Sequence, residues 1–303
     1  MSAVIPPESP ALSASAEHVL VADAVAYAAA RFERSGITGP RVDAELLASH
    51  VRGVGRGELQ AAMIRGDRLT PSEVESYRSL LERRAAREPL QHLTGVAYFR
   101  HLELAVGPGV FVPRPETEMV AQLAIDALRA QASPAPVAVD LGTGSGAIAL
   151  ALATEVPHAR VHAAENSVDA FVWTKENFAR VGASNARLAF IDLDRAFPEL
   201  DGTVSVLVSN PPYVPDAAVP RDPEVRLFDP AHALYGGEDG LDVVRQLAET
   251  GLRLVHPGGL IVIEHGELQG AEVRAVLTAA GWRSAATHPD LTLRDRATTA
   301  TRP

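Results

Sequence analysis

The sequence predicts an α/β protein, in which a mostly parallel β-sheet covered by helices on both faces follows a small all-helical domain and a β-hairpin. Three observations support this fold class. Residues 16–92 show only helical periodicity, residues 96–112 alternate with period two, and from Val137 onward short apolar runs alternate with helical segments. The 303 residues, 47% hydrophobic and 22% charged, are enough for about two domains.

The N-terminal part of the chain is expected to be helical. Residues 1–15 are rich in Pro, Ser and Ala, and we expect a disordered terminus there. Apolar residues at helical spacing then predict a helix over 15–34, and a second helix is expected over 43–51. The sequence Thr-Pro-Ser-Glu from Thr70 is typical of a helix start, because it supplies an N-cap, a proline and a capping glutamate. Together, residues 16–92 form the predicted helical domain.

A hairpin is expected to link the two domains. Between residues 96 and 112 apolar and polar residues alternate, which is typical of strands. A Gly-Pro-Gly turn interrupts this stretch, and Val110-Phe111-Val112 follows it as a further extended segment. We assign residues 93–113 to the hairpin linker and residues 114–303 to the second domain.

The second domain should contain the parallel sheet. Its seven strand candidates alternate with helical segments for most of its length: VAVDL, RVHAAE, LAFIDL, VSVLVS, LIVIEH, residues 282–288 and residues 296–302. In open α/β sheets, ligands bind beyond the carboxyl ends of the strands, near the point where the strand order reverses. The informative residues should therefore lie just after strands.

Composition excludes several classes of protein. The formal net charge of −10 argues against binding nucleic acid by broad neutralisation of phosphates. With no cysteine, the chain has no disulfide, thiolate nucleophile or Cys-zinc site, and the histidines show no metal-ligand spacing. No apolar run is long enough for a membrane span, and the N-terminus does not resemble a signal peptide. We therefore expect a soluble cytoplasmic protein without a metal.

The first motif that carries chemistry is a glycine loop in DLGTGSGAIALAL, residues 140–152. Its glycines permit backbone conformations that other residues avoid, and they let a ligand approach the main chain. The loop alone indicates a nucleotide-like cofactor, or simply a tight turn. We assign its five residues to cofactor binding: Gly142, Thr143, Gly144, Ser145 and Gly146.

Two carboxylates follow the next two strand candidates. Glu165 is placed to accept hydrogen bonds from both hydroxyls of a ribose, a group that NAD and S-adenosylmethionine share. Asp192 ends the third strand, where the adenine amine of such a cofactor is expected. Either residue could instead be an ordinary charged side chain at a strand end.

The motif Asn210-Pro211-Pro212-Tyr213 follows the fourth strand and discriminates between functions. Consecutive prolines cannot extend a strand, so the Pro211 carbonyl is held in a fixed direction. The Asn210 oxygen offers a second acceptor, and Tyr213 offers a flat aromatic face. Two acceptors and an aromatic plane suit a planar NH₂ group, although a simple Pro-Pro turn is the other reading.

Together, VFVPRPETE (110–118), DLGTGSGAIAL, SNPPYVP (209–215) and PAHALYGGEDGL resemble the protein-(glutamine-N5) methyltransferases that modify class 1 peptide chain release factors. The resemblance is strong from about residue 89 to residue 302. It implies a seven-stranded class I methyltransferase (Rossmann-like) sheet whose last strand is antiparallel, preceded by a helical domain and a hairpin. The cofactor it implies is S-adenosyl-L-methionine, held by the glycine loop, Glu165, Asp192-Leu193 and Asn210, while Asn210 to Tyr213 hold the substrate glutamine.

Three positions depart from the family pattern. Glu165 replaces the more usual Asp, and Leu193 stands where some members place an aromatic residue against the adenine. Leu293 occupies a position that is often glycine, which affects only the local turn.

Arg114 and Glu116 match the family closely, but a charged helix start would explain them equally well. His265 is more consistent with a packed histidine than with a base.

The resemblance implies an enzyme whose partner is a class 1 release factor, with no direct contact to nucleic acid or membrane, and we expect a monomer. The residues leave other functions open. One is methylation of adenine N6 in DNA or RNA, for which a similar Pro-Pro-aromatic motif is used. Others are methylation of a ribosomal-protein glutamine, a nicotinamide-dependent oxidoreductase, and a non-catalytic adaptor. We expect the helical domain to contact the protein partner.

Overall fold

The computed structural model describes residues 19–303. The chain divides into two compact units, Met1–Gly95 and Val96–Pro303. The expected disordered terminus, residues 1–15, lies outside the described residues. Within the described part, none of the helices is both long and apolar enough to span a membrane. Likewise, residues 19–303 bring together no group of three or more His, Asp or Glu side chains that could hold a metal ion.

The first unit is all-helical, as the sequence predicts. Its helices are α1 (Val21–Arg34), α2 (Pro40–Arg52), α3 (Arg56–Arg65), α4 (Pro71–Ala85) and α5 (Leu90–Thr94). The predicted capping box is present at the start of α4, where the Thr70 hydroxyl accepts from Glu73 N and the Glu73 carboxylate accepts from Thr70 N. A buried apolar cluster built mainly from α1, α2 and α4 holds the unit together.

Two helices of this unit, α3 and α5, are not predicted from the sequence. In α3 only Leu59 and Ala62 are buried, and Ile64 is 88% exposed, so no continuous apolar stripe marks the helix. The five-residue α5 is too short to show periodicity and follows Pro89 directly. Both helices depend on packing against their neighbours rather than on local pattern.

The second unit begins with a hairpin within the predicted range, in which β1 (Val96–Phe99) pairs antiparallel with β2 (Leu102–Ala105). Its turn lies at Arg100-His101 and not at the Gly-Pro-Gly sequence of residues 107–109. The expected strand Val110-Phe111-Val112 does not form. Val110 and Val112 are buried, but the segment pairs with no strand in the described chain. Period-two burial therefore occurs here in an irregular segment that packs on Trp173 and Ala170 of a later helix.

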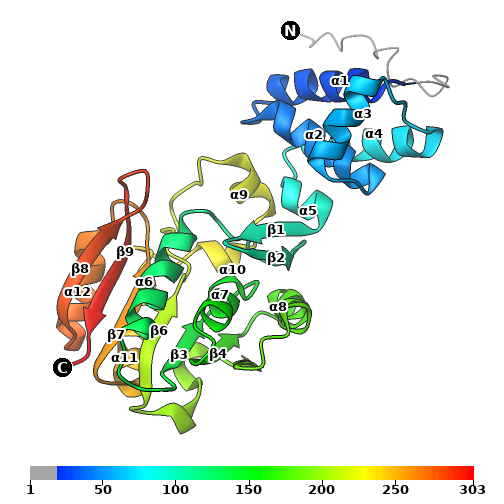
Figure 1. Ribbon diagram of the computed structural model, residues 1–303. Coiled ribbons are helices and arrows are strands. Elements are labelled where there is room, and N and C mark those ends of the chain that lie inside the picture. Colours follow the sequence, from blue (N-terminus) through cyan, green and yellow to red (C-terminus); the bar gives the residue numbers. More distant parts are fainter. Residues whose placement is uncertain (1–18) are drawn as a thin grey trace. The chain divides into compact units, whose positions relative to one another are not determined.

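The large sheet has seven strands in the order β5-β4-β3-β6-β7-β9-β8. All pairs are parallel except those of β9, which runs antiparallel to β7 and β8, so the predicted fold class is confirmed (Figure 1). The strands are β3 (Val137–Leu141), β4 (Arg160–Glu165), β5 (Ala186–Phe190), β6 (Val204–Ser209), β7 (Val255–Glu264), β8 (Arg283–Pro289) and β9 (Asp295–Thr301).

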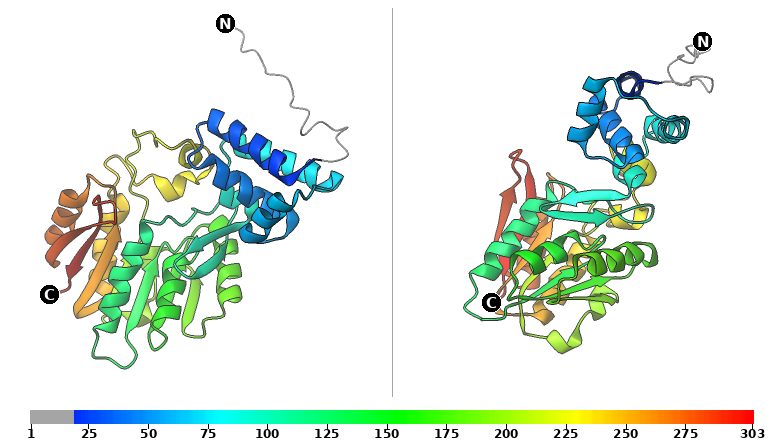
Figure 2. Two further views of the ribbon diagram at one scale, coloured as in Figure 1. Left: turned by 45° about the horizontal axis from the view of Figure 1, so that its top comes forward. Right: turned by 45° about the vertical axis from the view of Figure 1, so that its right-hand side comes forward.

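Helices cover both faces of this sheet (Figures 1 and 2). One apolar cluster joins α6 (Thr117–Arg129), α7 (Ala147–Glu155) and the inner side of α8 (Val168–Val181) to one face. A second cluster joins α11 (Asp242–Leu254) and α12 (Gly270–Ala280) to the other face. Two short helices, α9 (Pro223–Phe228) and α10 (Ala231–Leu234), lie in the connection from β6 to α11.

Candidate active site

A cavity of about 410 Å³ opens at the carboxyl ends of the parallel strands, where the strand order reverses between β3 and β6. This volume is in the range of small-molecule sites. Most of the predicted site residues line it: Gly142, Thr143, Gly144, Ser145, Glu165, Leu193, Asn210, Pro211, Pro212 and Tyr213. Gly146 and Asp192 are not among the lining residues.

The glycine loop owes its shape to backbone conformation. Gly142 and Gly144 have φ of 71° and 57°, in the left-handed region that residues with a Cβ rarely adopt. A Cβ at either position would meet no atom within 4 Å, so both face open space in the cavity. Gly146 (φ 85°) is the N-cap of α7 and packs against Phe178 instead. Its role is therefore in the turn rather than in the cavity wall.

The carboxylate of Asp140, in β3, holds the glycine loop in place through hydrogen bonds. Its Oδ2 accepts from the Thr143 hydroxyl (2.6 Å) and from Ala149 N of α7 (3.1 Å), while Oδ1 is buried without a partner. Burial raises the pKa of Asp140 to about 7, and the two hydrogen bonds only partly oppose this increase. This carboxylate therefore ties the loop to both β3 and α7.

Glu165 ends β4 and is only 6% exposed. Its Oε2 accepts from Gly144 N (2.8 Å), and its Oε1 accepts from Asn166 N (3.0 Å) and Ser167 N (2.8 Å). A carboxylate offers about four acceptor sites, so one site remains for a ligand, on Oε2. The longer side chain of Glu thus reaches back to the loop while it still lines the cavity.

Asp192 and Leu193, two and three residues after the end of β5, differ in position. Leu193 lines the cavity, whereas Asp192 is exposed and accepts a hydrogen bond from the side-chain amide of Asn166 (2.6 Å). Leucine at 193 presents an apolar surface without an aromatic plane. Contact between Asp192 and a cofactor remains a prediction.

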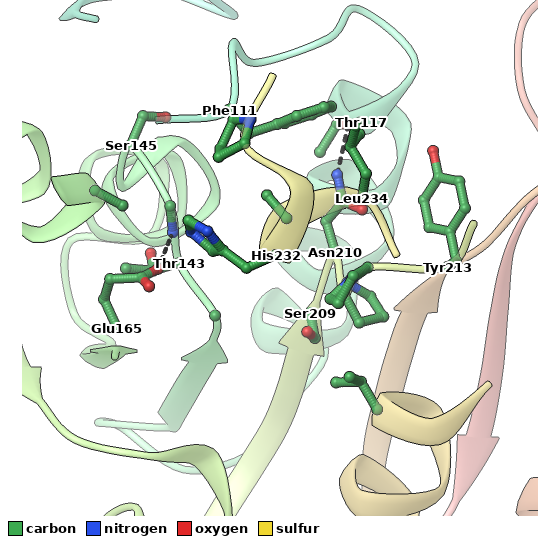
Figure 3. Close-up of a pocket in the computed structure, with 18 of the residues that line it drawn as sticks. Phe111, Thr117, Thr143, Ser145, Glu165, Ser209, Asn210, Tyr213, His232 and Leu234 are labelled. Carbon is green, nitrogen blue, oxygen red and sulfur yellow. Dashed lines mark hydrogen bonds between the residues drawn. The ribbon is translucent and has the colours of Figure 1, made fainter. Parts of the chain in front are cut away.

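The Asn-Pro-Pro-Tyr motif lies opposite Glu165 across the cavity, with His232 between them in the view of Figure 3. The Asn210 Nδ2 donates to the hydroxyl of Thr117 (3.4 Å), at the start of α6. The Oδ1 end has no hydrogen-bond partner among the described residues, so it can serve as an acceptor. The Tyr213 carbonyl, in turn, accepts from Gln269 Nε2 (2.9 Å), which fixes the end of the motif.

A buried polar cluster supports Tyr213. Burial raises the pKa of its phenol well above the ordinary value, and the nearby Glu264 carboxylate adds to the increase. Glu264, at the end of β7, is 1% exposed. Burial raises its pKa to about 7, while the neighbouring Thr117 and Tyr213 hydroxyls and the charge of Arg296 oppose the increase. Thr117 therefore lies between Glu264 and Asn210.

Arg114 joins two segments of the cavity wall. Its Nη2 contacts Asp229 Oδ2 at 2.6 Å, and its guanidinium lies 5.0 Å from the ring centre of Phe111. Burial raises the pKa of Asp229 to about 6, while Arg114 opposes the increase. A buried carboxylate needs such a partner, so the pair fixes the segment before α6 against the segment that follows α9.

His265 is fully buried, with Nδ1 2.8 Å from Gly266 O and Nε2 2.9 Å from Thr298 Oγ1. Burial lowers its pKa, which agrees with the packed-histidine interpretation. Sequence reasoning missed the contributions of Thr117, Asp229 and His232 to the site. Each lies inside a motif that was already prominent or next to one, but nothing in the sequence shows which side chains face the cavity.

Comparisons with known proteins identify the family of this chain. The family profile described as the PrmC N-terminal domain matches residues 23–95, and the one described as the Methyltransferase small domain matches residues 101–261. The release factor glutamine methyltransferase of Streptomyces coelicolor is 50% identical over 279 residues, covering 91% of this chain and 96% of that protein. Its counterpart in Bifidobacterium longum is 42% identical over 288 residues, covering 92% and 98%.

One further relative and one solved structure extend the comparison. The 4-amino-L-phenylalanine/4-methylamino-L-phenylalanine methyltransferase of Streptomyces pristinaespiralis is 39% identical over 275 residues, covering 89% of this chain and 91% of that protein. The solved structure of the T. thermophilus 16S rRNA N2 G1207 methyltransferase is 19% identical with a TM-score of 0.52, covering 69% of this chain and 50% of that chain, and it shows the shared fold. From the profiles and the near full-length relatives, the chain belongs to the release factor glutamine methyltransferase family.

Proposed function

We propose that this enzyme transfers a methyl group from S-adenosyl-L-methionine to the side-chain amide nitrogen (N5) of a glutamine in class 1 peptide chain release factors. The observation that carries the proposal is the orientation of Asn210. Its donor end is engaged by Thr117 at 3.4 Å, so its acceptor end is available in a cavity that also contains the glycine loop and Glu165. An amide NH₂ group, which only donates, is complementary to this arrangement.

The chain's own residues suit S-adenosylmethionine. The remaining acceptor site on Glu165 fits a ribose hydroxyl, and Leu193 offers an apolar surface for the adenine. The open left-handed glycines let the main chain approach the rest of the molecule. When bound, S-adenosylmethionine supplies an electrophilic methyl group on a positively charged sulfur.

The protein's main contribution to methyl transfer is orientation. An amide nitrogen is a poor nucleophile because its lone pair is delocalised into the carbonyl. The Asn210 Oδ1 and the Pro211 carbonyl would accept its two hydrogens and favour the positive charge that develops on the nitrogen. Tyr213 lines the cavity beside them as a neutral ring, and the proton can leave after transfer, so no dedicated base is required.

A panel of methyl acceptors tests this proposal. Radiolabelled S-adenosylmethionine is incubated with the enzyme and with a class 1 release factor, a ribosomal protein, double-stranded DNA or 4-amino-L-phenylalanine. We expect label only in the release factor. Label in DNA would favour the adenine alternative, and label in 4-amino-L-phenylalanine would match the acceptor named for one relative. Calorimetry with S-adenosylmethionine and NAD separates a methyltransferase from an oxidoreductase.

We also propose that the helical unit contacts the release factor, since all residues lining the cavity lie in the second unit. A chain without Met1–Gly95 should keep cofactor binding and lose most methylation of the intact release factor. An unchanged rate would contradict this role. We further propose that the enzyme acts in the cytoplasm as a monomer, without direct contact to nucleic acid.

A further inference from the structure

Three leucines are almost fully exposed at one edge of the sheet. Leu268, in the loop after β7, is 85% exposed, and Leu291 and Leu293, in the turn between β8 and β9, are 98% and 85% exposed. Both loops lie at the active-site edge, because β7 ends there and its antiparallel partner β9 begins there (Figure 1). Single exposed leucines are ordinary, whereas a group of them marks a contact surface.

The two loops are joined to each other. Arg294 of the turn lies 3.7 Å from the Glu267 carboxylate, next to Leu268. We refer to Leu268, Leu291 and Leu293 as the leucine rim. The exposed side chains of the rim thus belong to one local surface rather than to separate parts of the unit.

The turn that carries two of these leucines is well ordered by its own hydrogen bonds. Asp290 Oδ1 accepts from Thr292 N (2.8 Å), from the Thr292 hydroxyl (2.6 Å) and from Arg294 N (3.2 Å). Leu293 has a φ of 64°, a left-handed conformation that favours glycine. The chain therefore holds a large apolar side chain in water at a position where glycine would be less strained.

The leucine rim adjoins the substrate motif. Gln269, the residue after Leu268, donates from Nε2 to the Tyr213 carbonyl at 2.9 Å and accepts from Gly266 N at 2.9 Å. On the side of the turn, Asp290 lies 3.6 Å from Arg296, whose positive charge acts on the Tyr213 phenol and opposes the increase in its pKa. The loop after β7 thus contacts Tyr213 directly, and the turn between β8 and β9 is linked to it through Arg296.

We propose that the leucine rim docks an apolar surface of the protein substrate next to the glutamine that is methylated. This proposal rests on the proposed function. The cavity of about 410 Å³ has to hold the cofactor and a single side chain, so the residues that flank that glutamine must lie outside it, over its edge. On the Tyr213 side, that edge is bordered by the leucine rim. A folded protein substrate is therefore the occupant that the position of the rim favours.

A variant of the full-length chain carrying Leu268→Ser, Leu291→Ser and Leu293→Gly tests the proposal. These positions are exposed, and glycine relieves the strain at 293, so the fold should be retained. Steady-state kinetics are measured with an intact class 1 release factor and with a short peptide spanning its glutamine. The matched control is Val168→Ser with Val172→Ser on α8, which are 68% and 61% exposed.

We expect KM for the intact release factor to rise at least tenfold, with kcat at saturation unchanged. A tenfold rise corresponds to losing the binding free energy from burying about one leucine side chain. The kinetics with the peptide, the S-adenosylmethionine Kd and the α8 control should stay within twofold of the parent. An intact-protein KM within twofold of the parent overturns the proposal. So does an equal loss with protein and peptide, because the rim would then shape the site itself.

Sedimentation of the parent and the variant distinguishes another occupant. A parent dimer that the triple substitution converts to a monomer would show that the rim binds a second copy of this chain, and it would overturn the proposal. A parent enzyme that methylates the peptide but not the intact release factor would also overturn it. A parent that transfers no methyl group to either would overturn the proposed function itself.

Discussion

Replacing Asn210 by alanine should abolish most of the activity while it leaves the cofactor site intact. In the structure, Thr117 engages the donor end of the Asn210 side chain, and the acceptor end is available to the substrate. Asn210→Ala removes this acceptor at the point where positive charge develops on the amide nitrogen. Glu165 and the glycine loop lie across the cavity and keep their own hydrogen bonds (Figure 3).

The magnitude follows from the number of interactions lost. Losing one preorganised polar group that acts on the transition state typically lowers kcat by a factor of about 10² to 10³. The effect on folding should be small, because the bond to Thr117 is long at 3.4 Å and a neutral hydrogen bond contributes about 0.5–1.5 kcal/mol to stability. The S-adenosylmethionine Kd should change by less than about threefold.

Initial rates with radiolabelled S-adenosylmethionine and a release factor, together with calorimetry of cofactor binding, measure these effects. Asn185→Ala is a matched control, since Asn185 donates to the carbonyls of Ala153 and Ala159 away from the cavity. It should lower the melting temperature and leave kcat nearly unchanged. An Asn210→Ala enzyme that binds cofactor and methylates at near the parental rate would refute the role assigned to this side chain.

Other changes have distinct expected results. Glu165→Ala should weaken S-adenosylmethionine binding about tenfold or more in calorimetry, the loss of one charge-assisted hydrogen bond; an unchanged Kd would exclude it as a ribose ligand. Thr117→Val should lower kcat, whereas Thr117→Ser should restore it because the hydroxyl holds Asn210; equal rates for both would contradict this. The pKa of Asp140 is raised to about 7, so it is protonated more readily in the folded state, and its contribution to stability falls as pH rises from about 4 to about 7. The free energy of unfolding of Asp140→Asn minus that of the parent, measured in urea, should therefore increase by about 1 kcal/mol or more as the pH is raised from 5 to 8. A decrease of this difference would contradict the burial argument.

Much of the fold could be predicted because local signals and packing agree. The capping residues at Thr70, the buried strands and the glycine turn all specify the structure that forms. Prediction of secondary structure failed where the sequence shows no periodic pattern, or shows one that strands and irregular segments share. Helix α3 lacks an apolar stripe, and residues 110–112 alternate in burial like a strand without pairing as one.

The candidate site was predictable in its motifs but not in its contacts. The sequence places Glu165 after a strand, but it does not show that three backbone N–H groups already bind its carboxylate. Nor does the sequence show that Glu264, at the end of another strand, is a neighbour of Thr117 and Tyr213. Such contacts depend on side-chain direction across the sheet, which periodicity alone does not define.

The central claim is tested most directly by tandem mass spectrometry of a class 1 release factor incubated with the enzyme and S-adenosylmethionine. The account predicts one added methyl group, located by fragmentation on the side-chain nitrogen of a single glutamine, and its absence with the Asn210→Ala enzyme. An unmodified release factor, or a methyl group on any other residue, would contradict it.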